Sequence, residues 1–255
     1  MNNTAQLHQL NPNAIALCAL GRWIASRHWV PATGGNFSVR SSEHSALVTA
    51  SGKDKGELSP QDLLPVSWQD GELSCPGKPS AETALHARLY QLDGKIKAVL
   101  HTHSVQATVF SRLIAEDSYL FNGYEMQKAI SGNTSHDSPC PLALFDNTQD
   151  MPALADLVSQ RWQQQPLNWG LLVRGHGLYV WGRSLDEATQ LVRRFRGRAA
   201  MQQALGDVNA YWGNMLGAVQ VKTPDPAIDM LANGWLVYQT LGCRMMARSG
   251  FYQSG

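Results

Sequence analysis

Two histidines separated by one residue, His101 and His103, are the chemical feature from which the rest of the sequence is interpreted. They follow the apolar residues 98–100, a run that is typical of a buried strand. Side chains alternate between the two faces of a strand, so both imidazoles should project from one face. Neutral imidazole is a common zinc ligand, and a catalytic zinc usually takes three protein ligands and keeps one position open. The pair alone is equally compatible with two core or surface histidines.

A third histidine is set between two glycines in the motif LLVRGHGLYVWG (residues 171–182). Residues 170–182 are expected to form two strands around this Gly-His-Gly corner, because both flanking runs are apolar. Glycines on either side let the backbone approach its neighbours closely while the imidazole points at a ligand. We therefore take His176 as the third candidate ligand. The remaining histidines lack such a setting and are interpreted as surface or packing residues: His8, His28, His44, His86 and His136.

Two glutamates are candidates for acid/base chemistry. Glu125 lies downstream of the histidine pair, in the stretch NGYEMQKAI (122–130). A general acid/base carboxylate needs partial burial to hold a proton. A solvated glutamate on a short helix is the alternative. Glu82 falls in the first turn of a helix expected to start at Ser80, where a carboxylate complements the helix dipole. That position is by itself a sufficient structural reason for Glu82.

Three turns composed of small residues offer backbone N–H groups to an anion. The first, TGGN (33–36), has two adjacent glycines, and the second, SGKDKG (51–56), follows an expected strand. The third lies before the helix expected from residue 80, where a phosphate at the helix N-terminus is favourable. The alternatives are plain turns and, for the lysines of the second turn, solvated charge. The candidate phosphate-binding residues are Gly35, Asn36, Ser51, Gly52 and Ser80.

The elements that must position these residues follow from hydrophobic periodicity and capping signals. An opening helix follows the capping candidates Asn11 and Asn13, and a later helix follows Ser184, with Glu187 at the capping-box position. Between them the sequence predicts helices over residues 80–92, 106–115 and 147–163, a strand at 45–50, a hairpin of residues 64–68 and 71–73, the strand of the histidine pair and the two strands of 170–182.

The composition is that of an ordinary globular protein. The 255 residues suffice for one sizeable domain, or one domain with an appendage. A net charge of +1 implies neither a nucleic acid nor an anionic membrane as partner. The four cysteines form no CxxC pair, which suits a reducing compartment and argues against a thiolate zinc site. The first residues lack the features of a signal peptide and no apolar run is long enough to cross a membrane, so a cytoplasmic protein is expected.

Six motifs in chain order carry a resemblance to a known family: ATGGNFSVR (32–40), VTASGKDKG (48–56), KPSAETALH (78–86), AVLHTHS (98–104), YEMQKAI (124–130) and LLVRGHGLYVWG (171–182). With them, residues 1–191 resemble the class II aldolase/adducin-like superfamily. Within it the chain is most similar to the family of methylthioribulose-1-phosphate dehydratases of methionine salvage. The resemblance implies an α/β fold, as a three-layer α/β/α domain with a mainly antiparallel central sheet, and one Zn²⁺ per subunit.

The same resemblance implies roles for the candidate residues. His101, His103 and His176 match the zinc ligands, Glu125 matches the acid/base of the dehydratases, and the small-residue turns match phosphate-binding loops. Glu82 matches a glutamate that ligates zinc at rest or handles protons in the aldolases. The implied protein is a cytoplasmic lyase that dehydrates a ketose 1-phosphate, as a homotetramer with active sites at subunit interfaces. The alternatives are a class II sugar-phosphate aldolase or pentulose-phosphate 4-epimerase and, from another class, an adducin-like binding protein without a metal.

Residues 192–255 depart from this superfamily. They resemble a piece of the glycoside phosphorylases of the cellobiose-phosphorylase type, on the stretches 215–225 and 233–255. In that family the catalytic acid follows such a stretch, so we expect a helical tail without an active site of its own. The predicted helices, a basic one over 192–205 and a largely apolar one over 227–248, are separated by the chain-breaking residues TPDP (223–226). A true fusion and an unnatural join are both compatible with this pattern.

Overall fold

The computed structural model describes residues 11–69, 72–123, 127–128, 130, 133–195, 210 and 220–235. The chain divides into two compact units, Met1–Arg196 and Gly197–Gly255. In the second unit a short helix, α8 (Pro226–Met230), continues as a π-helical segment, η3 (Leu231–Trp235). Among the helices that the structure describes, none combines the length and the apolar character needed to cross a membrane.

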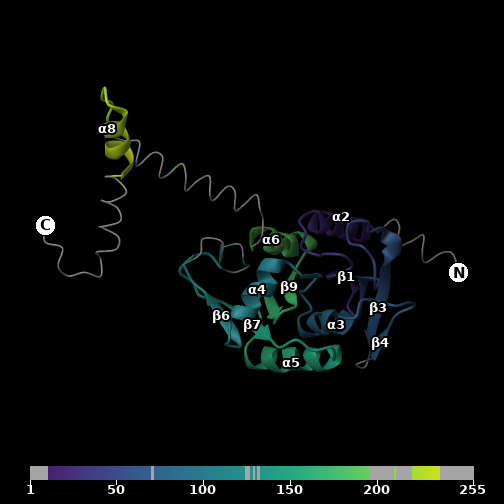
Figure 1. The fold of residues 1–255 in the computed structure, drawn as a ribbon. Coiled ribbons are helices and arrows are strands. Elements are labelled where there is room, and N and C mark those ends of the chain that lie inside the picture. The colour runs from purple at the N-terminus through teal and green to yellow at the C-terminus, as the bar shows by residue number, and fades with distance from the viewer. Residues whose placement is uncertain are drawn as a thin grey trace. The chain divides into compact units, whose positions relative to one another are not determined.

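A nine-stranded sheet forms the centre of the first unit, in the order β4-β3-β2-β1-β5-β9-β8-β7-β6 (Figure 1). All neighbouring strands are antiparallel except β7 and β8, which are parallel. The predicted mainly antiparallel sheet is therefore confirmed. The strands are β1 (Asn36–Ser42), β2 (Ser45–Thr49), β3 (Leu63–Gln69), β4 (Glu72–Ser74), β5 (Ala98–Thr102), β6 (Ser118–Phe121), β7 (Cys140–Phe145), β8 (Gly170–Val173) and β9 (Gly177–Gly182).

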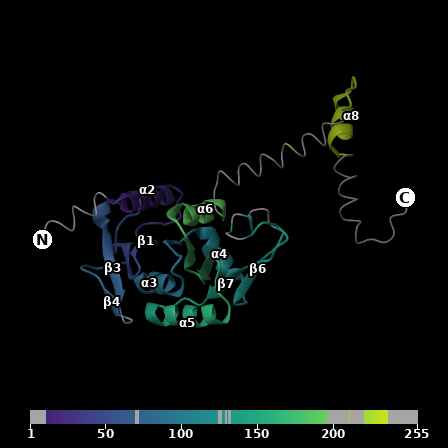
Figure 2. The same ribbon diagram turned by 180° about the vertical axis from the view of Figure 1, so that it is seen from behind.

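Helices cover both faces of this sheet, which gives the predicted α/β/α layers. Helices α2 (Pro12–Ser26) and α6 (Leu185–Phe195) lie on one face, and α3 (Thr83–Leu92) and α5 (Met151–Gln164) on the other, as Figures 1 and 2 show from opposite sides. Two buried apolar clusters correspond to the two faces. Strand β5 contributes to both, because Ala98 and Leu100 belong to one cluster and Val99 to the other. Helix α4 (Val105–Leu113) joins the first cluster through Ala107.

Local signals explain where most helices begin. Asn11 caps α2 by accepting a hydrogen bond from the backbone N–H of Asn13, and Asp150 caps α5 through the N–H of Ala153. In α6 the Ser184 hydroxyl accepts the N–H of Glu187, whose carboxylate accepts the N–H of Arg183. The caps of α2 and α6 were predicted from these residues and are confirmed, whereas the Asp150 cap was not predicted and α5 begins at Met151, later than the predicted residue 147.

The helix that the sequence placed from Ser80 begins later, at Thr83, so the prediction of Ser80 as its cap is wrong. Glu82 occupies the N-cap position, with no capping hydrogen bond from its side chain. The segment before it pairs instead with the end of β2: the N–H of Ser51 donates to the Lys78 carbonyl and the N–H of Ser80 donates to the Thr49 carbonyl, at 3.0 and 3.2 Å. This pairing brings the third small-residue turn beside the second.

Candidate metal centre

Three histidines and one glutamate from three separate segments converge on a single point. The ligand atoms of Glu82, His101, His103 and His176 all lie within 4.8 Å of one another. The Nε2 atoms of His101 and His176 are 3.4 Å apart, which is about the edge of a tetrahedron around an ion with bonds of about 2.0–2.1 Å to nitrogen. The Nε2 atoms of His101 and His103 are closer, at 2.7 Å, a hydrogen-bond distance between two rings.

Strand β5 and its neighbour β9 fix the ring of His101. The residue is fully buried and is paired with Asn36 on β1 and Tyr179 on β9. Its Nδ1 lies 3.1 Å from the Leu178 carbonyl, and its ring stacks on that of Tyr179 with 3.8 Å between the ring centres. A neutral His101 that donates its Nδ1 proton to this carbonyl keeps a lone pair on Nε2, the atom that faces the other rings.

His103 lies one residue beyond the end of β5, so the alternation of a strand accounts only for His101. Its backbone N–H donates to the Trp29 carbonyl at 2.7 Å. The first small-residue turn lies against its ring, since a Cβ at Gly34 would be 2.8 Å from the His103 Nδ1. A glycine is therefore required at position 34 for the turn and the ring to lie this close together.

His176 projects from the three-residue turn between β8 and β9. Its N–H closes this turn on the Val173 carbonyl at 3.1 Å. Gly175 has a φ of 65°, which favours glycine, and a Cβ at Gly177 would collide with the carbonyl oxygen of Thr102 on β5. The flanking glycines thus let the turn lie directly against β5, which is the role that the sequence predicted for them.

The surroundings hold all three rings in the neutral form at pH 7. Burial lowers the pKa of His101 well below its usual value, and repulsion from His103 and His176 lowers it further. Burial lowers the pKa of His103 to about 4, although Glu82 opposes the shift, and burial also lowers that of His176. A metal ion requires deprotonated ligands, so three neutral imidazoles beside a carboxylate fit a divalent cation.

Glu82 is oriented by two of the predicted phosphate-binding residues. One carboxylate oxygen, Oε2, accepts hydrogen bonds from Asn36 Nδ2 and Ser80 Oγ, at 2.6 and 2.8 Å. The other, Oε1, lies 3.6 Å from His176 Nε2. Asn36 and Ser80 therefore lie beside the metal ligands, and in this structure their side chains donate hydrogen bonds to the Glu82 carboxylate.

The other predicted phosphate-binding residues lie in the first and second small-residue turns. Gly35 is buried, with a φ of 69° and its backbone against Val30 and the His101 carbonyl. Ser51 and Gly52 are exposed, and Gly52 has open space around its Cα. Glu125, the predicted acid/base, lies outside the residues that the structure describes.

Lys55 is a functional candidate that the sequence interpretation missed. Its side chain is buried, and Nζ donates to the carbonyls of Thr33 and Lys53 at 2.8 and 2.7 Å, which joins the first two small-residue turns. Burial lowers the pKa of Lys55, although Asp54 and Glu82 oppose the shift. Lys53, by contrast, is half exposed and pairs with Asp62. No local pattern distinguishes the two lysines, because the difference depends on a turn 22 residues away.

Comparisons with known families divide the chain in two. The model of the class II aldolase and adducin N-terminal domain matches residues 15–203. The model of the catalytic domain of the glycosyl hydrolase 94 superfamily matches residues 211–255, most of which lie outside the part that the structure describes. Both resemblances inferred from the sequence are thus matched by a family model, the second over a short stretch only.

The similar proteins agree with the first of these matches. The chain is 47% identical to a methylthioribulose-1-phosphate dehydratase of Yersinia pestis (strain Pestoides F) over 76% of its own length and 89% of that protein. It is 48% identical to the dehydratase of Pectobacterium carotovorum subsp. carotovorum (strain PC1) over 70% of its length and 87% of that protein. A solved L-fuculose-1-phosphate aldolase from Thermus thermophilus shares the fold, with a TM-score of 0.55 and 22% identity over 80% of this chain and 96% of that one. The chain belongs to the class II aldolase and adducin N-terminal domain family.

Proposed function

We propose that the chain is a lyase that dehydrates 5-methylthioribulose 1-phosphate to 2,3-diketo-5-methylthiopentyl 1-phosphate in methionine salvage. The observation that carries the proposal is the 47% identity to a curated dehydratase over 89% of that protein's length. The convergence of His101, His103, His176 and Glu82 supports it, because an adducin-like binding protein has no need of such a donor set. We assign no glycosidic chemistry to residues 192–255, and we propose that the tail lacks an active site.

In the proposed enzyme His101, His103 and His176 hold one Zn²⁺. A catalytic zinc usually has three protein ligands and one further position, and three imidazoles fit this pattern. Imidazole nitrogen suits Zn²⁺, and none of the described residues at the site offers a thiolate. When bound, the ion supplies Lewis-acid polarisation of the substrate's C2 carbonyl, which acidifies the C3 proton.

The side chains of the protein then carry the protons. We propose that Glu82 handles the C3 proton, and its hydrogen bonds with Asn36 and Ser80 beside the histidines support this role. Glu125 gives a proton to the C4 hydroxyl, which leaves as water. The C3–C4 enol that remains becomes the 2,3-diketone when C4 gains a proton, so the reaction removes one water and changes no oxidation state overall.

The phosphate of the substrate is proposed to bind at the small-residue turns, through Gly35, Asn36, Ser51, Gly52 and Ser80. Two of these turns are linked by the buried Lys55, which adds positive charge near an expected anion. Contacts of this kind hold a substrate in register with the reacting groups rather than perform chemistry.

We further propose that the enzyme is a cytoplasmic homotetramer. The residues Val105, Val109 and Leu113 repeat every four positions along α4, with 65%, 52% and 75% of their surfaces exposed. Leu120 on β6 is also 55% exposed. An exposed apolar stripe of this kind is typical of a surface that another protein covers. Light scattering of the purified chain measures the assembly, and a monomer would contradict this part of the proposal.

The decisive experiment is an assay of the purified chain with its metal content measured in parallel. Dehydration of 5-methylthioribulose 1-phosphate, with about one zinc per chain, is the expected result. Cleavage of L-fuculose 1-phosphate without dehydration would favour the aldolase, and a chain without bound metal or activity would favour the binding protein. His176→Ala should lose both metal and activity, whereas His44→Ala, with an exposed side chain, should keep both.

A further inference from the structure

Helix α4 links two of the candidate metal ligands. It begins immediately after His103, where Ser104 caps it by accepting the backbone N–H of Ala107 at 3.3 Å. Two side chains of α4 then bind the backbone of the turn that carries His176. Thr108 Oγ1 donates to the His176 carbonyl at 3.1 Å, and Ser111 Oγ accepts the N–H of Gly175 at 2.9 Å.

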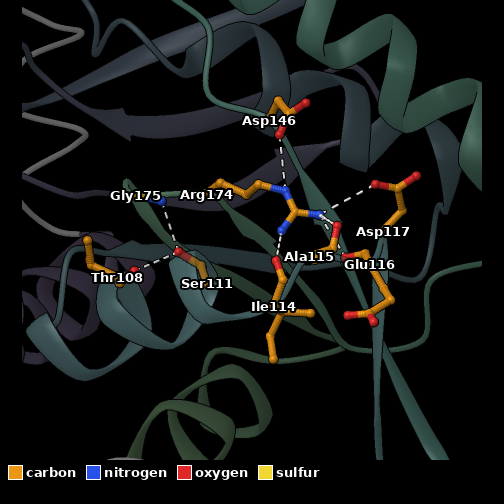
Figure 3. A network of polar contacts seen from close by, with 9 residues as sticks. All are labelled: Thr108, Ser111, Ile114, Ala115, Glu116, Asp117, Asp146, Arg174 and Gly175. Carbon is orange, nitrogen blue, oxygen red and sulfur yellow. Dashed lines mark hydrogen bonds and ion pairs between the residues drawn. The ribbon is translucent and has the colours of Figure 1, made fainter.

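The two hydroxyl groups are fixed by further hydrogen bonds. Ser111 is fully buried, and its hydroxyl proton goes to the Thr108 carbonyl at 2.7 Å, so its lone pair faces the N–H of Gly175 (Figure 3). The Thr108 hydroxyl lies between two carbonyl oxygens, that of Ser104 at 3.0 Å and that of His176 at 3.1 Å. The single proton of this hydroxyl group is shared between the carbonyl of Ser104, the residue that follows His103, and the carbonyl of His176.

Arg174 attaches the same turn to the segment that follows α4. Its guanidinium donates to the carbonyls of Ile114, Ala115 and Glu116, and it also reaches the carboxylates of Asp146 and Asp117 (Figure 3). The two aspartates are 92% and 97% exposed, so these ion pairs contribute little. The arginine side chain is only 15% exposed, and its planar fork of donors suits several carbonyls at once.

We propose that Thr108, Ser111 and Arg174 are positioning residues of the metal centre, and we call them the α4 brace. Thr108 and Ser111 bind the backbone of the turn at 174–176, and Arg174, within that turn, binds the carbonyls of residues 114–116. By fixing the turn, these contacts set the position of the His176 ring relative to His103. The inference rests on the proposed function, because it takes the histidines to be metal ligands. Outer contacts that orient a ligand typically change metal affinity about 10- to 100-fold when they are removed.

The test compares Zn²⁺ affinity, by competition with a chelator, in the wild type and in Arg174→Met, Ser111→Ala and Thr108→Val. The absorption spectrum of the Co²⁺-loaded proteins reports the ligand geometry, and thermal unfolding of the metal-free proteins reports the fold. Arg88→Met is the matched control, because Arg88 binds Asp156 and Ser159 across α3 and α5 on the opposite layer. We expect affinity to fall about 10- to 100-fold in Arg174→Met, and by less in the two hydroxyl variants, with altered Co²⁺ spectra.

Arg174→Lys should restore little, because an ammonium group lacks the fork that serves several carbonyls. Wild-type affinity and an unchanged Co²⁺ spectrum in all three brace variants would overturn the inference and leave the proposed function intact, and so would an equal loss in Arg88→Met. A wild type that binds neither ion would overturn the proposed function itself. If Arg174→Met fails to fold, Ser111→Ala and Thr108→Val decide the question, since each removes only one hydroxyl group.

Discussion

Lys55 is a buried ammonium group whose two described hydrogen bonds both go to backbone carbonyls, those of Thr33 and Lys53. It therefore holds together the two turns that we propose to bind the substrate's phosphate. We expect Lys55→Met to raise KM for the ketose phosphate about tenfold, the equivalent of one hydrogen bond to a charged group, with a smaller effect on kcat. Steady-state kinetics with 5-methylthioribulose 1-phosphate measure both constants.

Lys53→Met is the control for this prediction, because Lys53 is half exposed and pairs with Asp62 at the surface. Its kinetic constants should stay within about twofold of the wild type, as expected for an exposed ion pair. A fall in kcat at unchanged KM in Lys55→Met would show that the ammonium acts on the reacting groups rather than on the turns.

His86 makes the stability of the protein depend on pH. Its ring is fully buried and Nδ1 contacts the Ser38 hydroxyl at 2.7 Å, while burial lowers the pKa of His86 to about 4. Its pKa in the unfolded chain is about 6.5, so between these values only the unfolded state takes up the proton. The neutral, buried His86 contributes stability that is fully present above pH 6.5 and is lost as the pH falls towards 4. At pH 5 the free energy of unfolding should have fallen by about 2 kcal/mol.

Urea unfolding of the metal-free protein at pH 7.5 and pH 5 measures this loss. His101, His103 and His176 contribute in the same direction, because burial lowers their pKa values too. The contribution of His86 is therefore taken as a difference, and the loss in His86→Leu should be about 2 kcal/mol smaller than in the wild type. An equal loss in the two proteins would exclude His86 as a source of the pH dependence. His44→Gln, at an exposed site, serves as the control.

Single residues show what the sequence could and could not predict about the site. The three histidines could be predicted as ligands from local sequence alone. His101 and His103 follow an apolar run, and His176 lies between two glycines. The contacts of Glu82 with Asn36 and of Lys55 with Thr33 span 46 and 22 positions. Nothing in the neighbouring residues encodes such contacts, because they arise only when strands from different parts of the chain pair in one sheet.

At the scale of elements, the turn between β8 and β9 depends on its glycines for close contact with β5. A Cβ at Gly177 would collide with the Thr102 carbonyl and lie 3.1 Å from the His101 ring. We expect Gly177→Ala to destabilise the protein by about 1–3 kcal/mol, the usual cost of forcing extra volume into a packed site, and to lower metal affinity. Thermal unfolding and chelator competition measure the two effects.

Gly94→Ala is the matched control, because a Cβ at Gly94 meets nothing within 4 Å. Its unfolding temperature and metal affinity should stay close to those of the wild type. If Gly177→Ala behaved in the same way, the turn would not depend on this close approach, and the explanation of the Gly-His-Gly motif would be wrong.

Elements were predicted best where the signal is local. The strand of the histidine pair, the two strands of 170–182 and the helix of 147–163 correspond to β5, β8, β9 and α5, because apolar residues mark them, although β5 ends at Thr102, before His103. The start of α3 was misplaced by three residues, since Ser80 has the chemistry of a cap. Its backbone is used by the end of β2 instead, and a tertiary pairing of this kind overrides a local preference.

At the scale of the whole molecule, the two compact units carry unequal shares of the proposed function. The nine strands, both apolar clusters and the four converging ligands all lie within Met1–Arg196. The family model of the aldolase domain ends at residue 203, and that of the glycosyl hydrolase superfamily begins at 211. The break near residue 192 that the sequence indicated stays a prediction. The layered architecture itself came from the resemblance, because strand order depends on pairings that composition does not reveal.

This division predicts the result of removing the tail. A chain that ends at Gly206 keeps every group that we propose to bind metal, substrate or protons, and it keeps both buried clusters. We expect it to bind about one zinc per chain, as the full-length protein does. Its kcat for 5-methylthioribulose 1-phosphate should lie within about twofold of that of the full-length protein. A tenfold fall would require the loss of about 1.4 kcal/mol of transition-state stabilisation, and the tail supplies none of the proposed catalytic groups. Elemental analysis and steady-state kinetics on the two proteins, prepared side by side, measure both quantities. A large loss of metal or of kcat in the shorter chain would mean that residues 207–255 complete the active unit, and a large gain would mean that they inhibit it.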